Sequence, residues 1–447
     1  MLARADGSDV IIVNQEVAAE ILEKLDKEVI SEKELLRRVF SGVEVDYRIR
    51  GAVHAYVMEV SKRRNVIDFI LNKALKPRKI ENVQPFLRNL MRIAVYEMFF
   101  KKVPPALATD CAVRIAKKRF GMKAASFVNA ILRKAEKIDL KREMEKLDRV
   151  RYLALKYFHP EWYVRIAEKL GIEVEELLIA NLENTIYIRV NTLKTSEENL
   201  RRYLEKNNVI VEETFLPEVF RVISYDKPPA YLEEHNRLFV IQDLASCLVS
   251  KTLNPEPGDV VADLCAAPGS KTSHMAALME NRGKIIAVDN SKERVERMKA
   301  RLKRLGVENV RIILGDATKV RFEADKVLLD PPCSSTGSIR NYPSVKWRFD
   351  PKLFRKTVEL QRKMLKNASK IGEEIVYSTC SITFEENEEN VLFASRFLKV
   401  DDAYIGFGDK GISKYGKKRF PYAELVVRTY PHKHDTAGFF ISKLVRA

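Results

Sequence analysis

The chain has 447 residues, more than one hydrophobic core usually organises, so we expect two or three domains. Its 79 lysines and arginines exceed its 62 acidic residues, and the formal net charge of +17 favours a polyanionic partner. Five cysteines without a CxxC pair argue against a disulfide framework and against a zinc site. No run of about 18 apolar residues is present, and Met1–Gly7 lacks the apolar core of a signal peptide, so we expect a cytoplasmic protein with no membrane partner.

The first third of the chain has the apolar spacing of helices. The pattern runs from Val10 to about Lys137 and breaks at Lys76-Pro77, at Val103-Pro104-Pro105 and at Phe120-Gly121. We therefore expect a helical domain over residues 1–150. Four basic residues of this part are either solvated or form a phosphate-binding group, and as a group we favour phosphate binding: Arg88, Arg92, Arg133 and Lys134.

A connector and a small mixed subdomain follow. Residues Ile138 to Ile179 keep helical spacing, so we expect packed helices and no loose tether. From Thr185 the period changes to that of strands, with a helix between the first two of them: Tyr187–Asn191, helix Ser196–Asn207, Val209–Phe215 and Val219–Ile223. These elements predict an α+β subdomain over residues 151–240 that faces RNA, although its strand residues would also serve as plain core.

A strand, a turn of small residues and a helix come next. The apolar strand begins at Val260 and ends at Asp263, and the helix runs from about Thr272 to Glu280. The first free N–H groups of that helix point into the turn, where Gly269 lets a ligand approach the backbone. This arrangement predicts a nucleotide pocket.

Carboxylates follow the next three strands. Asp289 ends the strand Lys284–Val288, twenty residues after Gly269, which is the spacing of an acid that accepts ribose hydroxyls. Asp316 follows the strand Val310–Leu314, and Asp330 follows Asp325–Leu329. Small residues in place of GxGxxG suit an adenosine ligand without a pyrophosphate, such as S-adenosyl-L-methionine. An ordinary doubly wound sheet with acidic strand ends is the alternative.

The remaining elements complete an α/β domain over residues 241–447. They are a helix at Pro351–Ile371, a strand at Glu374–Ser378, a helix at Glu385–Leu398 and closing strands at Leu425–Tyr430 and Gly438–Leu444. This is the layout of a class I methyltransferase, a Rossmann-like, seven-stranded, mostly parallel sheet with an antiparallel final hairpin. The loop from Lys410 to Arg419 is either a flap that touches RNA or a solvated turn.

Two cysteines follow adjacent strands of this sheet. Cys333 comes after Asp330-Pro331-Pro332, and Cys380 comes after Ser378-Thr379. Ligands of open parallel sheets bind at the carboxyl ends of the strands, so both thiols should face one cleft. An exocyclic amine needs no thiol to accept a methyl group, whereas pyrimidine C5 becomes nucleophilic only after a group such as a thiolate adds to C6. The pair therefore points to C5 of a pyrimidine.

Several motifs together resemble those of the Sun-type (RsmB-like) RNA cytosine-5 methyltransferases. They are CAAPGSKT at 265–272, DPPCSSTG at 330–337, YSTCSITFEENEENV at 377–391, RVNTLK at 189–194 and QDLAS at 242–246. The segments Pro85–Met98 and Ala124–Lys134 resemble the NusB-type RNA-binding helical domain. The first resemblance covers the chain from about residue 160 to its end, and the second covers its first third.

The resemblance implies a role for each motif. Cys380 would add to C6, Cys333 would help to remove the C5 proton, and Asp330 would bond the N3 and amino edge of cytosine. The methyl donor would be held by Cys265, Ala266, Ala267, Pro268, Gly269, Ser270, Lys271, Asp289, Arg294, Asp316 and Asp330. We expect cations or helix ends to lower the pKa of Cys380, and we expect Asp330 to stay protonated more readily than usual.

Two departures from the family pattern concern the shape of the site. Ser270 and Ser335 each stand where glycine is common, so a positive φ at either would be strained. His432 and His434 resemble a zinc tract only superficially, and we interpret them as cleft rim or RNA contacts.

The leading interpretation is an S-adenosyl-L-methionine-dependent, metal-free methyltransferase that forms 5-methylcytosine in single-stranded or opened rRNA or tRNA and acts as a monomer. A noncatalytic RNA-binding or ribosome-assembly factor on the same scaffold is the first alternative. An amine-directed RNA methyltransferase is the second, and Cys333 stands where that class would carry an aromatic residue.

Overall fold

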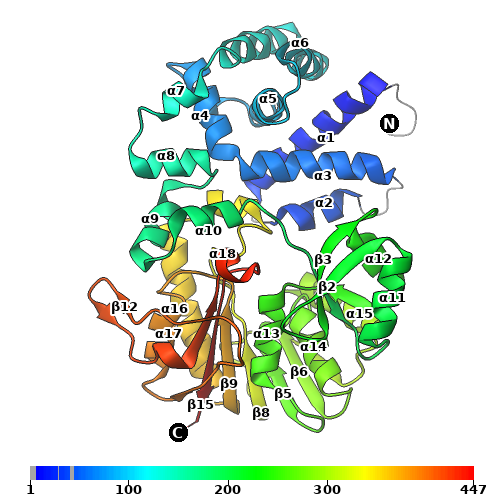
Figure 1. Ribbon diagram of the computed structural model, residues 1–447, viewed down its shortest axis with the longest axis vertical. Coiled ribbons are helices and arrows are strands. Elements are labelled where there is room, and N and C mark those ends of the chain that lie inside the picture. Colours follow the sequence, from blue (N-terminus) through cyan, green and yellow to red (C-terminus); the bar gives the residue numbers. More distant parts are fainter. Residues whose placement is uncertain (1–6, 29, 41–44, 447) are drawn as a thin grey trace. The chain divides into compact units, whose positions relative to one another are not determined.

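The computed structural model describes residues 7–28, 30–40 and 45–446, so most of the segment Met1–Gly7 considered above lies outside the described residues. The chain divides into two compact units (Figure 1). Unit 1 comprises Met1–Glu168, Ile172–Leu182 and Tyr342–Arg348, and unit 2 comprises Lys169–Gly171, Glu183–Asn341 and Phe349–Ala447. The predicted three-part division with boundaries near residues 150 and 240 stays a prediction. None of the helices in the described ranges is long and apolar enough to cross a membrane.

Unit 1 is built from helices. They are α1 (Gly7–Lys27), α2 (Glu32–Phe40), α3 (Tyr47–Lys62), α4 (Arg64–Leu75), α5 (Pro85–Phe99), α6 (Pro105–Ala135), α7 (Leu140–Met144), α8 (Arg149–Lys156), α9 (Glu161–Leu170) and α10 (Val174–Ala180), with a short 3₁₀ turn η1 (Ile80–Asn82). The breaks at Pro77 and Pro105 fall between helices as predicted. The third break is a kink inside α6, where Gly121 adopts φ 79° and ψ −173°.

Two of the four predicted phosphate ligands form ion pairs with carboxylates of unit 1. Arg88 Nη2 lies 2.7 Å from Asp26 Oδ2, and the buried Arg92 pairs with Asp68 at 2.7 Å and with Asp26 at 3.3 Å. A cation held between two carboxylates, as Arg92 is, is not available to a phosphate. The proposed group of four is therefore wrong for Arg92. Arg88 pairs with one of these carboxylates, and Arg133 and Lys134 are exposed on α6, so a phosphate contact stays a prediction for these three.

A segment from the second half of the chain belongs to unit 1. It is the 3₁₀ turn η2 (Pro343–Trp347), in which the Glu32 carboxylate accepts from the N–H and the hydroxyl of Ser344 at 2.6 and 2.9 Å. The buried Lys346 ammonium donates to the carbonyls of Lys62 and Phe158 at 3.0 and 2.6 Å. In the chain, η2 lies between β8 (Ala324–Leu329) and α16 (Pro351–Ala368), and these bonds hold it against the helices of unit 1.

Unit 2 contains a small antiparallel sheet of four strands in the order β2-β3-β1-β4. The strands are β1 (Tyr187–Val190), β2 (Val209–Glu213), β3 (Val219–Tyr225) and β4 (Phe239–Ile241), accompanied by α11 (Glu197–Lys206) and α12 (Pro229–Asn236). Ser196 caps α11 by accepting from the N–H of Asn199, as its sequence position predicts. The fourth strand, β4, was not among the strands predicted for this subdomain.

The main sheet of unit 2 has the predicted α/β fold. Its strands run in the order β11-β14-β15-β9-β8-β5-β6-β7, and β10 pairs with β15 (Figure 1). Besides β8, the strands of this sheet are β5 (Val260–Asp263), β6 (Lys284–Asp289), β7 (Val310–Leu314), β9 (Gly372–Thr379), β10 (Lys399–Asp401), β11 (Asp409–Lys410), β14 (Val426–Thr429) and β15 (Phe439–Val445). The seven predicted strands are its parallel part, β5 to β9, and the antiparallel β14 and β15. The sequence missed β10 and β11, which are three and two residues long.

Helices pack along this sheet. They are α13 (Leu244–Leu253), α14 (Ser270–Leu278), α15 (Lys292–Leu305), α16 and α17 (Glu388–Ala394), with the turns η3 (Ala423–Leu425) and α18 (Pro431–His434). Helix α13 contacts β8, β9 and β15, whereas α16 contacts β8 and β9. The predicted loop 410–419 forms a small hairpin of β12 (Lys414–Tyr415) and β13 (Lys418–Arg419).

Two close contacts hold the loops at the carboxyl edge of the sheet. A Cβ on Gly337 would lie 1.9 Å from the carbonyl oxygen of Gly438, so only glycine lets these two backbones meet. The buried Arg428 of β14 pairs with Glu388 of α17 at 2.6 Å and donates to the carbonyl of Ile382 at 3.0 Å. The loops after β8 and β9 are thereby fixed to β15 and β14.

Asp263 ends β5 inside the core. Its side chain is 1% exposed and accepts a hydrogen bond from the Thr272 hydroxyl at 2.7 Å. Burial raises the pKa of Asp263 to about 7 from its ordinary value of 3.8, because the hydrogen bond offsets only part of the lost hydration.

We expect Asp263→Asn to change how stability depends on pH. In the wild type the raised pKa of Asp263 favours the folded state below about pH 4, and this contribution is lost as the pH rises to about 7. Asparagine does not titrate. The free energy of unfolding of the variant should therefore rise relative to that of the wild type by about 1.4 kcal/mol per pH unit in this window. Urea unfolding at four pH values between 4.5 and 7.5 measures the difference, and parallel curves would contradict the raised pKa.

Candidate active site

The turn after β5 presents backbone N–H groups toward the end of β6. Gly269 has φ 91°, and a Cβ there would press on Met298 and Leu302 at 3.0–3.4 Å, so the turn requires glycine. Helix α14 begins at the next residue, Ser270, which has no positive φ and is not strained. The predicted strand, turn and helix are all present.

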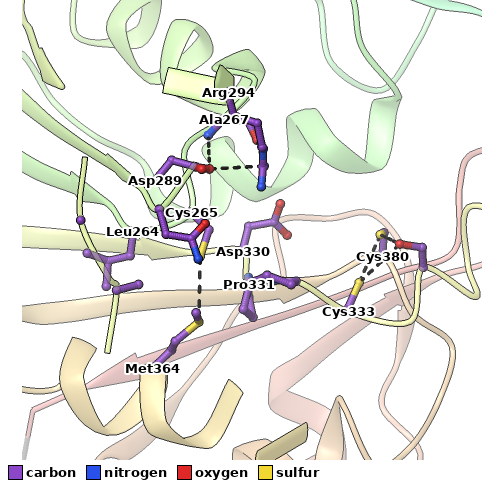
Figure 2. A pocket seen from close by; sticks show the side chains of 15 residues that line it. Leu264, Cys265, Ala267, Asp289, Arg294, Asp330, Pro331, Cys333, Met364 and Cys380 are labelled. Atoms are coloured by element: carbon purple, nitrogen blue, oxygen red, sulfur yellow. Dashed lines mark hydrogen bonds and ion pairs between the residues drawn. The ribbon is translucent and has the colours of Figure 1, made fainter. Parts of the chain in front are cut away.

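Asp289 at the end of β6 organises one side of the site. Its carboxylate accepts from the N–H groups of Ala267 and Ser291 at 3.3 and 3.0 Å, and Arg294 Nη2 lies 3.3 Å from it. Arg294 also donates to the carbonyl of Ala267, so this guanidinium links the turn after β5 to the turn after β6 (Figure 2). The buried Asp289 keeps lone pairs for further donors.

A pocket of about 710 Å³, including its open mouth, lies beside Asp289. The predicted site residues that line it are Cys265, Ala267, Asp289, Arg294, Asp330, Cys333 and Cys380. The predicted donor-binding residues that do not line it are Ala266, Pro268, Gly269, Ser270, Lys271 and Asp316. Asp316 turns its carboxylate toward its own loop, where the N–H and the hydroxyl of Thr318 donate to it at 2.9 and 2.7 Å.

Asp330 lies between the Asp289 side of the pocket and the two thiols (Figure 2). Its Oδ2 accepts from the Lys271 ammonium at 2.7 Å, and its Oδ1 accepts from the Ser378 hydroxyl at 2.8 Å. Burial opposes the charge on Lys271, but the Asp330 carboxylate outweighs burial and raises the pKa of Lys271. Both oxygens of Asp330 therefore already accept hydrogen bonds from the protein, and the protonated carboxyl expected from the sequence stays a prediction.

The two thiols meet at the other end of the pocket. Cys333 Sγ and Cys380 Sγ are 3.3 Å apart, and Ser335 Oγ lies 3.5 Å from Cys380 Sγ and 4.0 Å from Cys333 Sγ (Figure 2). Ser335 has φ 54°, so the residue that replaces glycine does adopt the left-handed conformation. Its hydroxyl lies within reach of both thiols.

The pKa values of the two thiols are shifted in opposite directions. The hydrogen bond from Cys333 lowers the pKa of Cys380 against the effect of burial, with further help from Ser335. The same contact, together with burial and the charges of Glu386 and Asp330, raises the pKa of Cys333 well above its usual value. The pKa of Cys380 is lowered as predicted, and the leading cause is the hydrogen bond from Cys333, where the sequence had suggested cations or helix ends.

The other three cysteines lie among apolar neighbours or against the pocket wall. Cys111 and Cys247 are buried, and burial raises the pKa of both. Cys265 Sγ lies 4.0 Å from Met364 Sδ at the pocket, and burial raises its pKa as well. None of the three is prepared for nucleophilic attack.

The two histidines near the C-terminus, His432 and His434, belong to α18. His434 Nδ1 accepts from the N–H of Tyr430 at 3.0 Å, and His434 Nε2 faces Asp409 at 3.5 Å. No group of three possible metal ligands occurs within the ranges that the structure describes. Neither His432 nor His434 lines the pocket, so a contact with RNA stays a prediction for them.

The pocket also has lining residues that the sequence did not single out. They are Leu264, Asn290, Gly315, Ala317, Pro331, Pro332 and Met364. Most of them are neighbours in sequence of the predicted acids at strand ends. Since ligands of parallel sheets bind at the carboxyl ends of strands, these neighbours could have been predicted as lining residues too. Met364 lies on α16, and nothing in its local sequence indicates that this helix face meets the turn after β5.

Comparisons with known proteins agree with this architecture. A family model described as 16S rRNA methyltransferase RsmB/F matches residues 250–445, and a model of the NusB family matches residues 13–137. The crystal structure of PH0851 superposes with a TM-score of 0.82 at 28% identity and covers 97% of this chain and 99% of that one.

Two relatives illustrate the sequence similarity. The probable ribosomal RNA small subunit methyltransferase B of Bacillus subtilis is 31% identical over 446 residues, which is 96% of this chain and 98% of the relative. The tRNA (cytosine(72)-C(5))-methyltransferase of Pyrococcus horikoshii is 42% identical over 213 residues, which is 46% of this chain and 52% of the relative. The chain therefore belongs to the RsmB/F family of methyltransferases and carries a NusB-family domain in its N-terminal part.

Proposed function

We propose that the protein is an S-adenosyl-L-methionine-dependent RNA (cytosine-5-)-methyltransferase that works through a covalent bond between Cys380 and C6 of the target base. The observation that carries this proposal is the 3.3 Å contact of Cys333 and Cys380 in the pocket that also contains Asp289 and Asp330. Relatives named as methyltransferases of ribosomal RNA and of tRNA cytosine C5 support it.

The pocket fits the proposed methyl donor. Asp289 retains acceptor capacity for two ribose hydroxyls, and the small residues Ala267, Gly315 and Ala317 leave room for an adenosine beside it. When bound, S-adenosyl-L-methionine supplies an electrophilic methyl group. The residues that would hold it are Cys265, Ala267, Asp289, Arg294 and Asp330 from the lining, supported by Ala266 and Pro268–Lys271, and Asp316 from its own turn.

Cys380 is suited to begin the reaction. Its lowered pKa supplies a thiolate, which adds to C6 and pushes the electrons of the C5–C6 double bond toward C5 and the ring. Asp330, which is held by hydrogen bonds from Lys271 and Ser378, would bond the N3 and amino edge of cytosine and so orient the base.

Cys333 is suited to end the reaction. The thiolate of Cys380 is the first cause of the raised pKa of Cys333, and that negative charge disappears once Cys380 has become a thioether. Cys333 can then release its proton to water at the pocket mouth and accept the proton from C5. The electrons of the C5–H bond restore the double bond, and the Cys380 sulfur leaves with the electrons of the C6–S bond.

The target nucleotide must leave its stack to reach these sulfur atoms. The substrate is therefore single-stranded RNA, a loop or a locally opened helix of ribosomal or transfer RNA. The net charge of +17 supports a phosphate-binding role, so binding should weaken with salt. A noncatalytic RNA-binding factor would need neither the paired thiols nor their unequal charge, which is why we favour the enzyme.

We expect Cys380→Ala to abolish methylation, with a rate loss of roughly a thousandfold or more, because C5 is not activated without addition at C6. Bisulfite sequencing of RNA from cells that carry the wild type or the variant measures 5-methylcytosine and identifies the modified position. Cys247→Ala is the matched control, since Cys247 is buried in α13 away from the pocket. An active Cys380→Ala protein would contradict the covalent route.

We expect Cys333→Ala to accumulate a protein–RNA adduct, because addition at C6 proceeds while removal of the C5 proton is slowed. Denaturing gel electrophoresis of the full chain, incubated with RNA and S-adenosyl-L-methionine, detects the adduct as a retarded band. The double variant Cys333→Ala/Cys380→Ala should show no band. Ready release of RNA by Cys333→Ala would contradict the elimination role of Cys333.

We expect Asp289→Ala to weaken donor binding on the order of 100-fold. The variant loses two charge-assisted hydrogen bonds from ribose hydroxyls, each worth about 1.5 kcal/mol. Calorimetric titration with S-adenosylhomocysteine measures the affinity without turnover. Asp325→Asn is the control. Asp325 lies at the start of β8, at the end of the strand away from the pocket, and accepts a hydrogen bond from the N–H of Val260. Equal affinities of Asp289→Ala and wild type would contradict the donor site.

A further inference from the structure

Behind the thiol pair lies a buried carboxylate that has no cationic partner within the described part of the chain. Glu386 is 0% exposed and lies in the turn between Cys380 and α17. Its Oε1 accepts from the N–H of Ser334 at 2.8 Å and from the Gln361 amide at 3.0 Å, and its Oε2 accepts from the hydroxyls of Ser334 and Thr383. Four donors around two oxygens satisfy an ionised carboxylate.

These bonds join the two loops that carry the cysteines. Ser334 directly follows Cys333, whereas Glu386 belongs to the loop that starts at Cys380. A cluster of hydroxyls continues the connection, with Ser381 Oγ at 3.1 Å from Ser334 Oγ and at 3.0 Å from Thr336 Oγ1. The N–H of Gly337 donates to the carbonyl of Cys380 at 2.9 Å. A change at Glu386 would therefore alter the separation of the two sulfur atoms.

The charge of Glu386 acts on Cys333. The titratable groups that face Cys333 are Cys380, Glu386, Asp330 and Tyr377, and Lys271 reaches this end of the site through Asp330. Glu386 and Asp330 are both negative, but Asp330 is paired with the Lys271 ammonium and Glu386 has only neutral donors. Glu386 is therefore the carboxylate whose charge is least compensated near Cys333.

We propose that Glu386 is a positioning residue that fixes the loop of Cys333 against the loop of Cys380 and, through its negative charge, keeps Cys333 protonated in the resting protein. This inference rests on the proposed function, because it assigns the nucleophile to Cys380 and the later base to Cys333. It explains why two chemically identical side chains 3.3 Å apart take different roles. A base held beside a negative charge also binds the C5 proton more strongly once it is formed.

The test measures the two thiols directly and needs neither RNA nor methyl donor. The full chain is alkylated with iodoacetamide between pH 5 and pH 10, and mass spectrometry follows the peptides of Cys333 and Cys380 separately. In the wild type we expect Cys380 to react at lower pH than Cys333. Glu386→Gln should lower the pH midpoint of Cys333 by about one unit, because the negative charge is removed while the side-chain shape is kept. Glu386→Asp should keep the wild-type midpoint.

A neighbouring buried carboxylate provides the matched control. Glu388 is also 0% exposed and two residues away, but its charge is paired with Arg428. Glu388→Gln should lower the thermal midpoint of unfolding and leave the Cys333 midpoint in place. An unshifted Cys333 in Glu386→Gln, or an equal shift in Glu388→Gln, would overturn the proposal.

A milder variant covers the outcome that Glu386→Gln does not fold. Ser334→Ala removes one donor to Glu386 and keeps its charge, so the Cys333 midpoint should stay while kcat on RNA falls about tenfold and the KM for the methyl donor is unchanged. An unchanged kcat would overturn the positioning role. If no variant or wild type methylates RNA but the thiol midpoints behave as described, the proposed reaction fails and the role of Glu386 at the thiols stands.

Discussion

The parallel pairing of β8 with β9 is the constraint on which the site depends. Leu329 lies opposite Tyr377 in this register, so the residues that follow, Asp330 and Ser378, emerge side by side and their side chains bond at 2.8 Å. Cys380 directly follows β9, whereas Cys333 follows β8 after Asp330 and two prolines. Because parallel strands end at the same edge of the sheet, the two sulfur atoms meet there. A register slip of one residue would turn the Asp330 and Ser378 side chains to opposite faces.

Three carboxylates at that edge are each paired with a cation. The Lys271 ammonium pairs with Asp330, Arg294 pairs with Asp289, and Arg428 pairs with Glu388. Each of these pairs also joins two segments, so charge pairing and loop placement come from the same contacts. Glu386 instead accepts hydrogen bonds from neutral donors. The leading cause of the lowered pKa of Cys380 is likewise a hydrogen bond, the one from Cys333.

Much of this could be predicted from the sequence because it rests on local periodicity. Apolar runs gave β5 to β9, and residues immediately after those runs gave Asp289, Asp330, Cys333 and Cys380. The features that escaped prediction depend on contacts between distant segments. The sequence around Met364 does not indicate that this residue lines the pocket. The sequence around Arg88 and Arg92 does not indicate that both pair with Asp26. Glu386 belongs to a motif recognised from the sequence, but its partners Ser334 and Gln361 come from other elements.

Ser335 shows how such contacts can outweigh a local preference. A non-glycine residue at φ 54° costs on the order of 1 kcal/mol, and glycine would avoid that cost. Glycine would also remove the hydroxyl that lies 3.5 Å from Cys380 and contributes to the lowered pKa of that thiol. A hydrogen bond to a charged group is worth about 1.5–3 kcal/mol, which exceeds the strain. The serine is therefore compatible with a stable loop as long as Cys380 carries the negative charge, and the strained backbone and the thiolate support each other.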